Sequence, residues 1–173
     1  LDPNSPQGDR AVLGSLLRFG AHARRGSSAA AVQPGKLRAY GFSAANTPDL
    51  VPILACVAAV AEGTTHITDC GRLRMKESDR LVTTSKALNA LGAKVRIDED
   101  SLIITGTQQL TGGRVYAHND HRIAMMAAIA ATRCEGPVEI VGAECVAKSY
   151  PQFFDDYRAL GGSVVLEDAE RSA

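Results

Sequence analysis

Residues 47–80 read TPDLVPILACVAAVAEGTTHITDCGRLRMKESDR, an apolar run with charged residues at both ends. The run from Leu50 to Ala61 carries no charge, which predicts a helix that is buried on nearly all sides. Thr47 and Pro48 are typical of a helix start, with Thr47 as the cap and Pro48 in the first helical position. The KESDR cluster at 76–80 packs charges of both signs together. A core element has no need of such a cluster, whereas a site that moves protons on an anionic substrate does.

The composition is that of one globular domain. The chain has 173 residues, of which 45% are hydrophobic, and no apolar run approaches the roughly 20 residues of a membrane span. Lys+Arg and Asp+Glu are both 19, which argues against a nucleic-acid or membrane surface, where a basic excess supplies affinity. The four cysteines lack metal-ligand spacing and are predicted to be free thiols in a reducing, cytoplasmic compartment.

Hydrophobic periodicity and turn residues predict the remaining elements. We expect helices over about 9–19, 49–62, 78–91, 120–133 and 152–160, and strands over about 64–68, 94–97, 102–105, 114–117, 138–141 and 163–166. Between the first two helices, at most two short strands are expected around a turn at Pro34–Gly35. Asn119 is expected to cap the fourth helix.

An internal repeat organises these elements. Asp49 and Asp120, like Lys76 and Lys148, lie about 70 residues apart. The repeated unit is βαβαββ, so we expect one α/β (α+β) domain over 1–173. It would hold the remainder of a first repeat at 1–46, a second repeat at 47–106, a third at 107–166 and a tail at 167–173. The missing first half of the first repeat, and a start without Met, favour a piece of a longer chain.

Charged residues collect at the predicted helix N-termini. If the repeats stack with their helices parallel, these ends share one pole, where free N–H groups suit phosphate and carboxylate. Arg80, Arg122 and Lys148 would add full positive charges there. Simpler interpretations stay open, since Asp49 could be only a cap, Asp79–Arg80 a surface ion pair, Lys76–Glu77 a solvated helix entrance and His121 a hydrogen-bonded structural residue.

With TPD at 47–49, KESDR at 76–80, NDHR at 119–122 and AKSYP at 147–151 in this order, the chain resembles the 5-enolpyruvylshikimate-3-phosphate (EPSP) synthase family. The resemblance runs from NSPQGD at 4–9 to LGG at 160–162. It implies the C-terminal domain of a two-domain enzyme of the shikimate pathway. That enzyme transfers the enolpyruvyl group of phosphoenolpyruvate to the 5-hydroxyl of shikimate 3-phosphate and releases phosphate, with no metal or organic cofactor.

The resemblance also implies roles for individual residues. Asp49 corresponds to the base that takes the 5-hydroxyl proton, and Glu77 to the acid that protonates the methylene carbon. Lys76 corresponds to a lysine on the shikimate phosphate side. The residues implied to hold phosphoenolpyruvate are Arg80, Arg122 and Lys148, with Asp120 and His121 in supporting roles. The absent N-terminal domain would supply the opposite wall, so we expect this chain alone to be inactive, without nucleic-acid or membrane partners.

Some features depart from the family pattern. The stretch FSAAN precedes TPD where many members carry acidic residues, and Arg72 replaces a substrate-contacting Asn of some relatives. Two alternative functions share part of this pattern. A domain like UDP-N-acetylglucosamine enolpyruvyl transferase would share the repeat but lacks KESDR and NDHR, and a non-catalytic phosphate-binding module would share only the helix pole.

Overall fold

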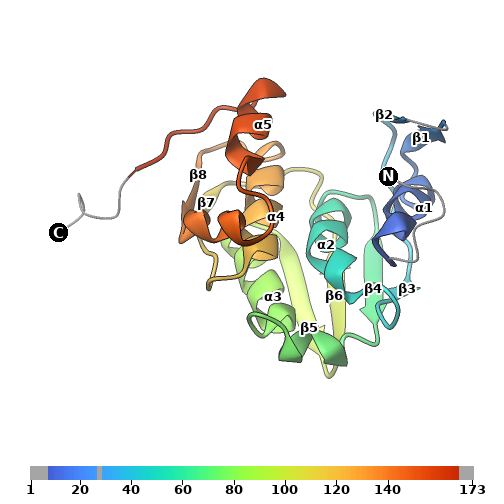
Figure 1. Cartoon of the computed structure of the whole chain (residues 1–173). Coiled ribbons are helices and arrows are strands. Elements are labelled where there is room, and N and C mark those ends of the chain that lie inside the picture. The colour runs from blue at the N-terminus through green and yellow to red at the C-terminus, as the bar shows by residue number, and fades with distance from the viewer. Residues whose placement is uncertain (1–7, 27–28, 168–173) are drawn as a thin grey trace.

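Helices and short β-sheets alternate along residues 8–26 and 29–167, the part of the chain that this computed structural model describes (Figure 1). The helices are α1 (Val12–Arg18), α2 (Val51–Ala59), α3 (Arg80–Ala90), α4 (His121–Ala131) and α5 (Phe153–Ala159). The 3-10 turns are η1 (Gly8–Ala11), η2 (Pro48–Leu50), η3 (Gly71–Met75) and η4 (Ala143–Lys148). The strands are β1 (His22–Arg25), β2 (Ala30–Gln33), β3 (Phe42–Ser43), β4 (Thr64–Thr68), β5 (Lys94–Asp98), β6 (Ser101–Thr105), β7 (Gly113–Tyr116) and β8 (Val138–Val141).

The largest described sheet has the strand order β3-β4-β6-β5. Strand β3 runs parallel to β4, whereas β6 is antiparallel to both β4 and β5. Burial alternates along β4, with Thr65 and Ile67 facing inward, because successive side chains of a strand point to opposite faces. Strands β7 and β8 form a separate parallel pair, and β1 and β2 form an antiparallel hairpin.

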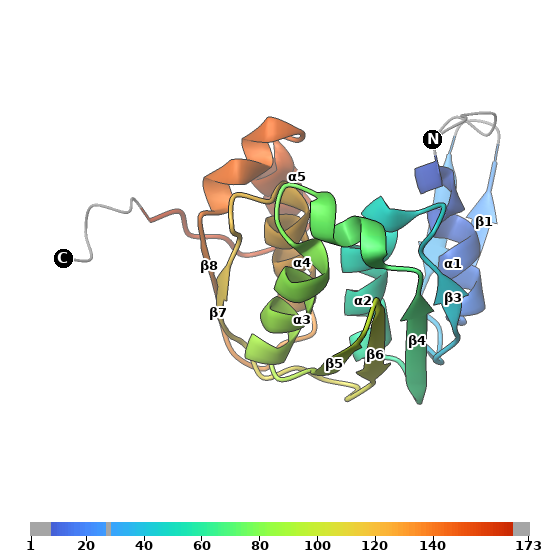
Figure 2. The same ribbon diagram turned by 90° about the horizontal axis from the view of Figure 1, so that it is seen from below.

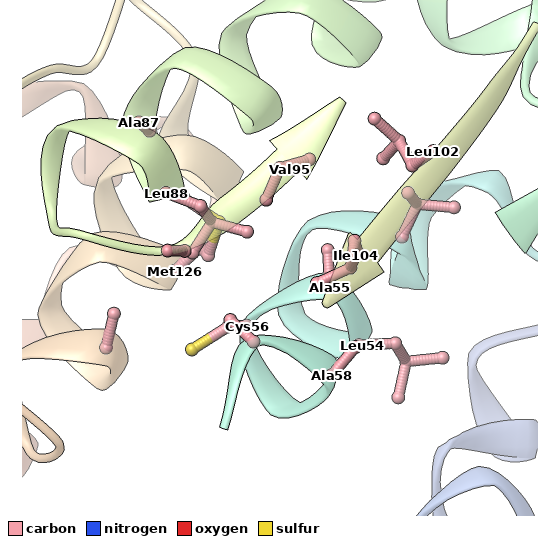
Figure 3. Packing of buried hydrophobic residues seen from close by; sticks show 14 of the residues in the cluster. Leu54, Ala55, Cys56, Ala58, Ala87, Leu88, Val95, Leu102, Ile104 and Met126 are labelled. Atoms are coloured by element: carbon pink, nitrogen blue, oxygen red, sulfur yellow. The ribbon is translucent and has the colours of Figure 1, made fainter. Parts of the chain in front are cut away.

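Helices α2, α3 and α4 pack against one another, and α2 also packs against β4 and β6 (Figure 2). The apolar run predicted as a buried helix is confirmed as such, since seven residues of α2 are buried. Figure 3 shows Leu54 and Cys56 of this helix near Ile104 of β6, with Leu88 and Met126 from the neighbouring helices. Burying an aliphatic side chain of this size stabilises the fold by about 1.5–3 kcal/mol. The core therefore fixes the three helices relative to one another.

Three successive segments follow related paths. The order α1-β1-β2 is followed by β3-α2-β4-η3-α3-β5-β6 and then by β7-α4-β8-η4-α5. In both later segments a helix connects two parallel strands, and a 3-10 turn then leads to the next helix. The domain limits given above remain a prediction.

Two predictions on strands are wrong. Residues 163–166 are not a strand, and the Val165 and Leu166 side chains are largely exposed. In the preceding repeat the corresponding strand β5 pairs with β6, and no strand follows Leu166 among the described residues to play that part. Pro34–Gly35 is not the turn of the first hairpin, because β1 and β2 pair with Arg25 opposite Ala30, and the Gly26 N–H donates to the Ala29 carbonyl.

The predicted caps also need correction. Thr47 is the N-cap residue of η2 with Pro48 in its first turn, as predicted, but its side chain accepts no capping hydrogen bond; its carbonyl accepts from the Leu50 N–H. The cap of α4 is Asp120, whose carboxylate accepts from the Arg122 N–H, and not Asn119. Asn119 has a φ of 58°, so helical geometry can begin only after it.

Candidate active site

The N-terminal ends of α2, α3 and α4 bring one group of charged side chains together. Asp49 lies in η2 before α2, Arg80 is the first residue of α3, and Asp120 caps α4. The shared helix pole expected from the sequence is therefore present for these three helices. We call Asp49, Lys76, Glu77, Arg80, Asp120 and Arg122 the polar cluster.

Arg80 lies at the centre of the polar cluster, and its side chain is 0% exposed. Its Nη1 donates to Asp49 Oδ1 at 2.8 Å, and its Nη2 donates to Glu77 Oε2. The guanidinium Nε donates to Asp120 Oδ2 at 2.9 Å, and Nη2 reaches Asp120 Oδ1 at 3.2 Å. Interpreting Asp79–Arg80 as a surface ion pair is therefore wrong, because Arg80 is buried and pairs with other carboxylates, whereas Asp79 pairs with Arg74.

Asp120 is the buried counterpart of Arg80. Its carboxylate is 0% exposed and also accepts hydrogen bonds from Ser78 Oγ at 2.9 Å and from the Arg122 N–H at 3.0 Å. Burial raises the pKa of this carboxyl group, but the hydrogen bond and charge of Arg80, with Ser78 and the Arg122 amide, outweigh it and hold the pKa below its usual value. Asp120 is thus an ionised group inside the protein.

Asp49 is the carboxylate with the most cationic neighbours. Lys76 Nζ lies 3.0 Å from its Oδ1, and Arg122 Nη2 lies 3.7 Å from its Oδ2, in addition to the Arg80 contact. Partial burial raises its pKa, whereas the hydrogen bond from Lys76 and the charges of Arg122, Lys76 and Arg80 together lower it below the usual value. Asp49 is therefore ionised at neutral pH, as a general base must be.

Arg122 connects the cluster to the start of the chain. Its Nη1 donates to the Asp49 carbonyl at 3.2 Å, and its Nη2 lies 3.7 Å from Asp9 Oδ2 in η1. Residue 9 is predicted from the sequence only as the start of the first helix, and this contact was not predicted. Asp9 lies at a predicted helix start, as Asp49 and Asp120 do, and this position is the sequence feature that could have placed Asp9 near the cluster.

Lys148 and His121 lie beside the cluster. Lys148 Nζ donates to the Asn119 carbonyl at 2.7 Å and so reaches the start of α4, although its own side chain is exposed. His121 is buried, and its Nδ1 has no hydrogen-bond partner among the described residues. The interpretation of His121 as a hydrogen-bonded structural residue is not supported at this nitrogen.

Part of the polar cluster is exposed to solvent, although Arg80 and Asp120 are buried. The Asp49 and Glu77 side chains are 33% and 41% exposed, and the hollows of about 270 and 130 Å³ lie elsewhere, beside Asn89 and Tyr157. Two partly exposed carboxylates thus flank a buried guanidinium, with Lys76 and Arg122 at the same face. Such a face can bind an anion and exchange protons with it.

The family described as EPSP synthase (3-phosphoshikimate 1-carboxyvinyltransferase) matches residues 1–157. The chain belongs to the EPSP synthase family. Relatives named 3-phosphoshikimate 1-carboxyvinyltransferase include those of Clostridium kluyveri, 46% identical over 164 residues, and Clostridium acetobutylicum, 49% identical over 166 residues. The alignments cover 95% of this chain but only 38% of the length of each relative. The chain thus spans well under half of the length of these relatives.

Solved structures agree with this family assignment. An EPSP synthase from Acinetobacter baumannii superimposes with a TM-score of 0.80 at 29% identity, over 91% of this chain and 40% of that one. The enolpyruvyl transferase NikO from Streptomyces tendae superimposes with a TM-score of 0.73 at 26% identity, over 90% of this chain and 37% of that one. The α/β fold expected from the repeat and from the resemblance is confirmed.

Two further observations describe this EPSP synthase family member. All four cysteines are free thiols, with Cys56, Cys70 and Cys145 buried and Cys134 partly buried. Within residues 8–26 and 29–167, no helix has the length and apolar character needed to cross a membrane. The roles of the individual site residues remain predictions.

Proposed function

We propose that this chain is the proton-transfer half of a cytoplasmic enzyme that moves the enolpyruvyl group of phosphoenolpyruvate to the 5-hydroxyl of shikimate 3-phosphate and releases phosphate. Asp49 acts as the base and Glu77 as the acid. Lys76 faces the phosphate of shikimate 3-phosphate, and Arg122 and Lys148 bind phosphoenolpyruvate. The resemblance implies that Arg80 binds phosphoenolpyruvate as well, but its side chain is 0% exposed and paired with Asp49, Glu77 and Asp120, so its proposed role is to hold the two proton-transfer carboxylates.

The observation that carries this proposal is the pair of carboxylates on one buried guanidinium. Arg80 Nη1 donates to Asp49 and Nη2 donates to Glu77. The two carboxylates therefore lie on the same guanidinium but are bound by different nitrogens of it. Both keep an exposed part, so each can reach a bound molecule. Lys76 and Arg122 keep Asp49 ionised while they offer positive charge to phosphate and carboxylate groups.

The proposed chemistry uses the two carboxyl groups in turn. Asp49 takes the hydroxyl proton as the hydroxyl oxygen bonds to the phosphate-bearing carbon, while the carboxyl group of Glu77 supplies a proton to the methylene carbon. The tetrahedral adduct then returns a proton from that carbon to Glu77, and its bond to the phosphate oxygen breaks. The proton held by Asp49 leaves with the phosphate. The cations stabilise the negative charge that develops on the departing phosphate.

The partial exposure of the polar cluster supports a site that is completed by another part of the enzyme. The chain spans 38% of the length of its curated relatives. In the polar cluster, the Asp49 and Glu77 carboxylates are partly exposed to solvent. A site that is exposed to solvent on one side would bind anions weakly, because water screens the charges. We therefore propose that this chain alone is inactive and that the rest of the enzyme closes the site.

The fold alone does not fix the acceptor, since NikO is named an enolpyruvyl transferase without being named an EPSP synthase. The identities of 46–49% to relatives named 3-phosphoshikimate 1-carboxyvinyltransferase favour shikimate 3-phosphate.

Reconstitution tests the proposal. The part of the Clostridium acetobutylicum relative that this chain does not cover is co-expressed with the chain, and phosphate release from phosphoenolpyruvate is measured with shikimate 3-phosphate as acceptor. We expect release with shikimate 3-phosphate and none without it or with UDP-N-acetylglucosamine. A stable reconstituted complex that releases no phosphate with shikimate 3-phosphate would contradict the proposal.

A further inference from the structure

We infer that Asp120, held by Ser78, is a positioning residue that fixes the rotation of the Arg80 guanidinium so that its two Nη groups face Asp49 and Glu77. The importance of this orientation for catalysis rests on the proposed function above. The orientation itself rests only on contacts within the chain.

Asp120 has no capacity left for a substrate. Its Oδ2 accepts from Ser78 Oγ and Arg80 Nε, and its Oδ1 accepts from Arg80 Nη2 and the Arg122 N–H. A carboxylate offers about four lone-pair sites, and these contacts use them. Because the side chain is also 0% exposed, Asp120 can act only through its neighbours.

The contact with Arg80 is made side-on, through Nε and one terminal nitrogen. This planar two-point contact permits one rotation of the guanidinium, as bidentate pairs do. In that rotation Nη1 points to Asp49 and the second hydrogen of Nη2 is available to Glu77. With Asp49 and Glu77 alone, the arginine would have only single-point contacts to partly exposed carboxylates.

Ser78 in turn fixes Asp120 from the side of α3. Its hydroxyl lies 2.9 Å from Asp120 Oδ2 and 2.9 Å from Thr83 Oγ1, and Thr83 Oγ1 donates to the Asp79 carbonyl. Thus a chain of hydrogen bonds connects the first turn of α3 with the cap of α4. The buried Asp120 carboxylate therefore orients both Arg80, which holds the proton-transfer carboxylates, and the start of α4.

An alternative role for Asp120 is that of a helix cap alone, and Asp120→Asn separates the two roles. Asparagine caps helices as well as aspartate does, so its amide oxygen can still accept from the Arg122 N–H. Its amide nitrogen, however, is a donor and cannot accept from Arg80 Nε. The variant therefore keeps the cap and removes the two-point contact.

The test measures hydrogen exchange of the Arg80 Nε–H by NMR in the 15N-labelled chain, with the signal identified by its loss in Arg80→Lys. We expect a protected Nε–H in the natural chain and exchange at least about tenfold faster in Asp120→Asn, with the Arg122 amide changed by less than about twofold. Asp100→Asn is the matched control, since Asp100 pairs with the exposed Arg74, 3.0 Å away, and should leave Arg80 unchanged.

Unchanged exchange of the Arg80 Nε–H in folded Asp120→Asn would overturn the inference. If that variant does not fold, Ser78→Ala decides, because it removes one hydrogen bond to Asp120 and leaves the ion pair. We expect exchange about threefold faster in Ser78→Ala, and no change there would overturn the inference as well. None of these readouts requires turnover, so an inactive reconstituted enzyme would contradict the proposed function and leave this inference standing.

Discussion

Replacing Arg80 by methionine should destabilise the chain far more than replacing any exposed arginine. Arg80 is 0% exposed and pairs with three carboxylates. Methionine is a flexible apolar side chain that fills much of the same space but offers no hydrogen-bond donor. Asp49 and Glu77, at 33% and 41% exposed, can turn to water when the guanidinium is gone. Asp120, at 0% exposed, cannot.

The magnitude therefore depends mainly on Asp120. Removing one partner of a buried ion pair costs about 3–5 kcal/mol, because it leaves the other charge unpaired in the interior. A domain of this size has a stability of about 5–15 kcal/mol, so Arg80→Met should remain folded but with much of its stability lost. Ser78 and the Arg122 amide still hydrogen-bond Asp120, which keeps the cost toward the lower end of this range.

The cost should depend on pH in a definite direction. In the natural chain the pKa of Asp120 is held below its unfolded value by Arg80, despite burial. It thus contributes stability above about pH 4 that is lost as the pH falls through the folded pKa. In Arg80→Met burial dominates, so the pKa of Asp120 rises above its unfolded value and protonation on acidification relieves the penalty. The difference in free energy of unfolding between the two chains should shrink toward acid pH.

Urea unfolding followed by circular dichroism at about pH 7 and about pH 4 measures this difference. Arg74→Met is the matched control, because Arg74 also pairs with two carboxylates but is 39% exposed, and should cost under about 1 kcal/mol. A cost of Arg80→Met at neutral pH that equals the control, or that grows on acidification, would refute this reasoning.

Three further predictions concern the core, a cap and a charge. Leu54→Ala should lower the free energy of unfolding by about 2–5 kcal/mol, since Leu54 is 1% exposed; a loss below about 1 kcal/mol in urea unfolding would mean that the site collapses around the cavity. Asp79→Ala should cost about 0.5–2 kcal/mol by the same measurement, because the Asp79 carboxylate accepts from the Val82 N–H at 3.2 Å and caps α3; an unchanged midpoint would argue against the cap. The lowered pKa of Asp49 means that its ionised form stabilises the folded chain above the unfolded pKa and that this contribution is lost as pH falls through the folded pKa. The difference in stability between the natural chain and Asp49→Asn should therefore decline on acidification, and a difference that is flat in pH would contradict the assigned ion pairs.

Local signals predicted most of the helices and strands, because the apolar runs and the glycines that end them act within a few residues. The apolar run of α2 and the strand β4 were found in this way. The errors fall where the decisive contact is distant or the backbone is unusual. Residues 163–166 lack a described strand to pair with, and the left-handed φ of Asn119 moves the start of α4 to Asp120.

The residues of the candidate site could be predicted from the sequence, but their burial could not. The predicted helix N-termini placed Asp49, Arg80 and Asp120 at one pole, with Asp49 and Asp120 at equivalent positions of the repeat. The burial of Arg80 was not predictable, since it depends on Asp120, 40 positions along the chain, reaching the guanidinium through the packing of α3 on α4. The contact of Arg122 with Asp9 likewise depends on the tertiary fold.

The most direct test of the central claim is the rate of phosphate release by the reconstituted enzyme with Glu77→Gln. Glutamine keeps the size of the side chain but cannot give a proton to the methylene carbon, so we predict a fall in kcat of at least about 100-fold. Glu135→Gln is the control, because Glu135 is exposed beyond the opposite end of α4, and should leave kcat unchanged. Full turnover by Glu77→Gln would contradict the assignment of the polar cluster as the proton-transfer site.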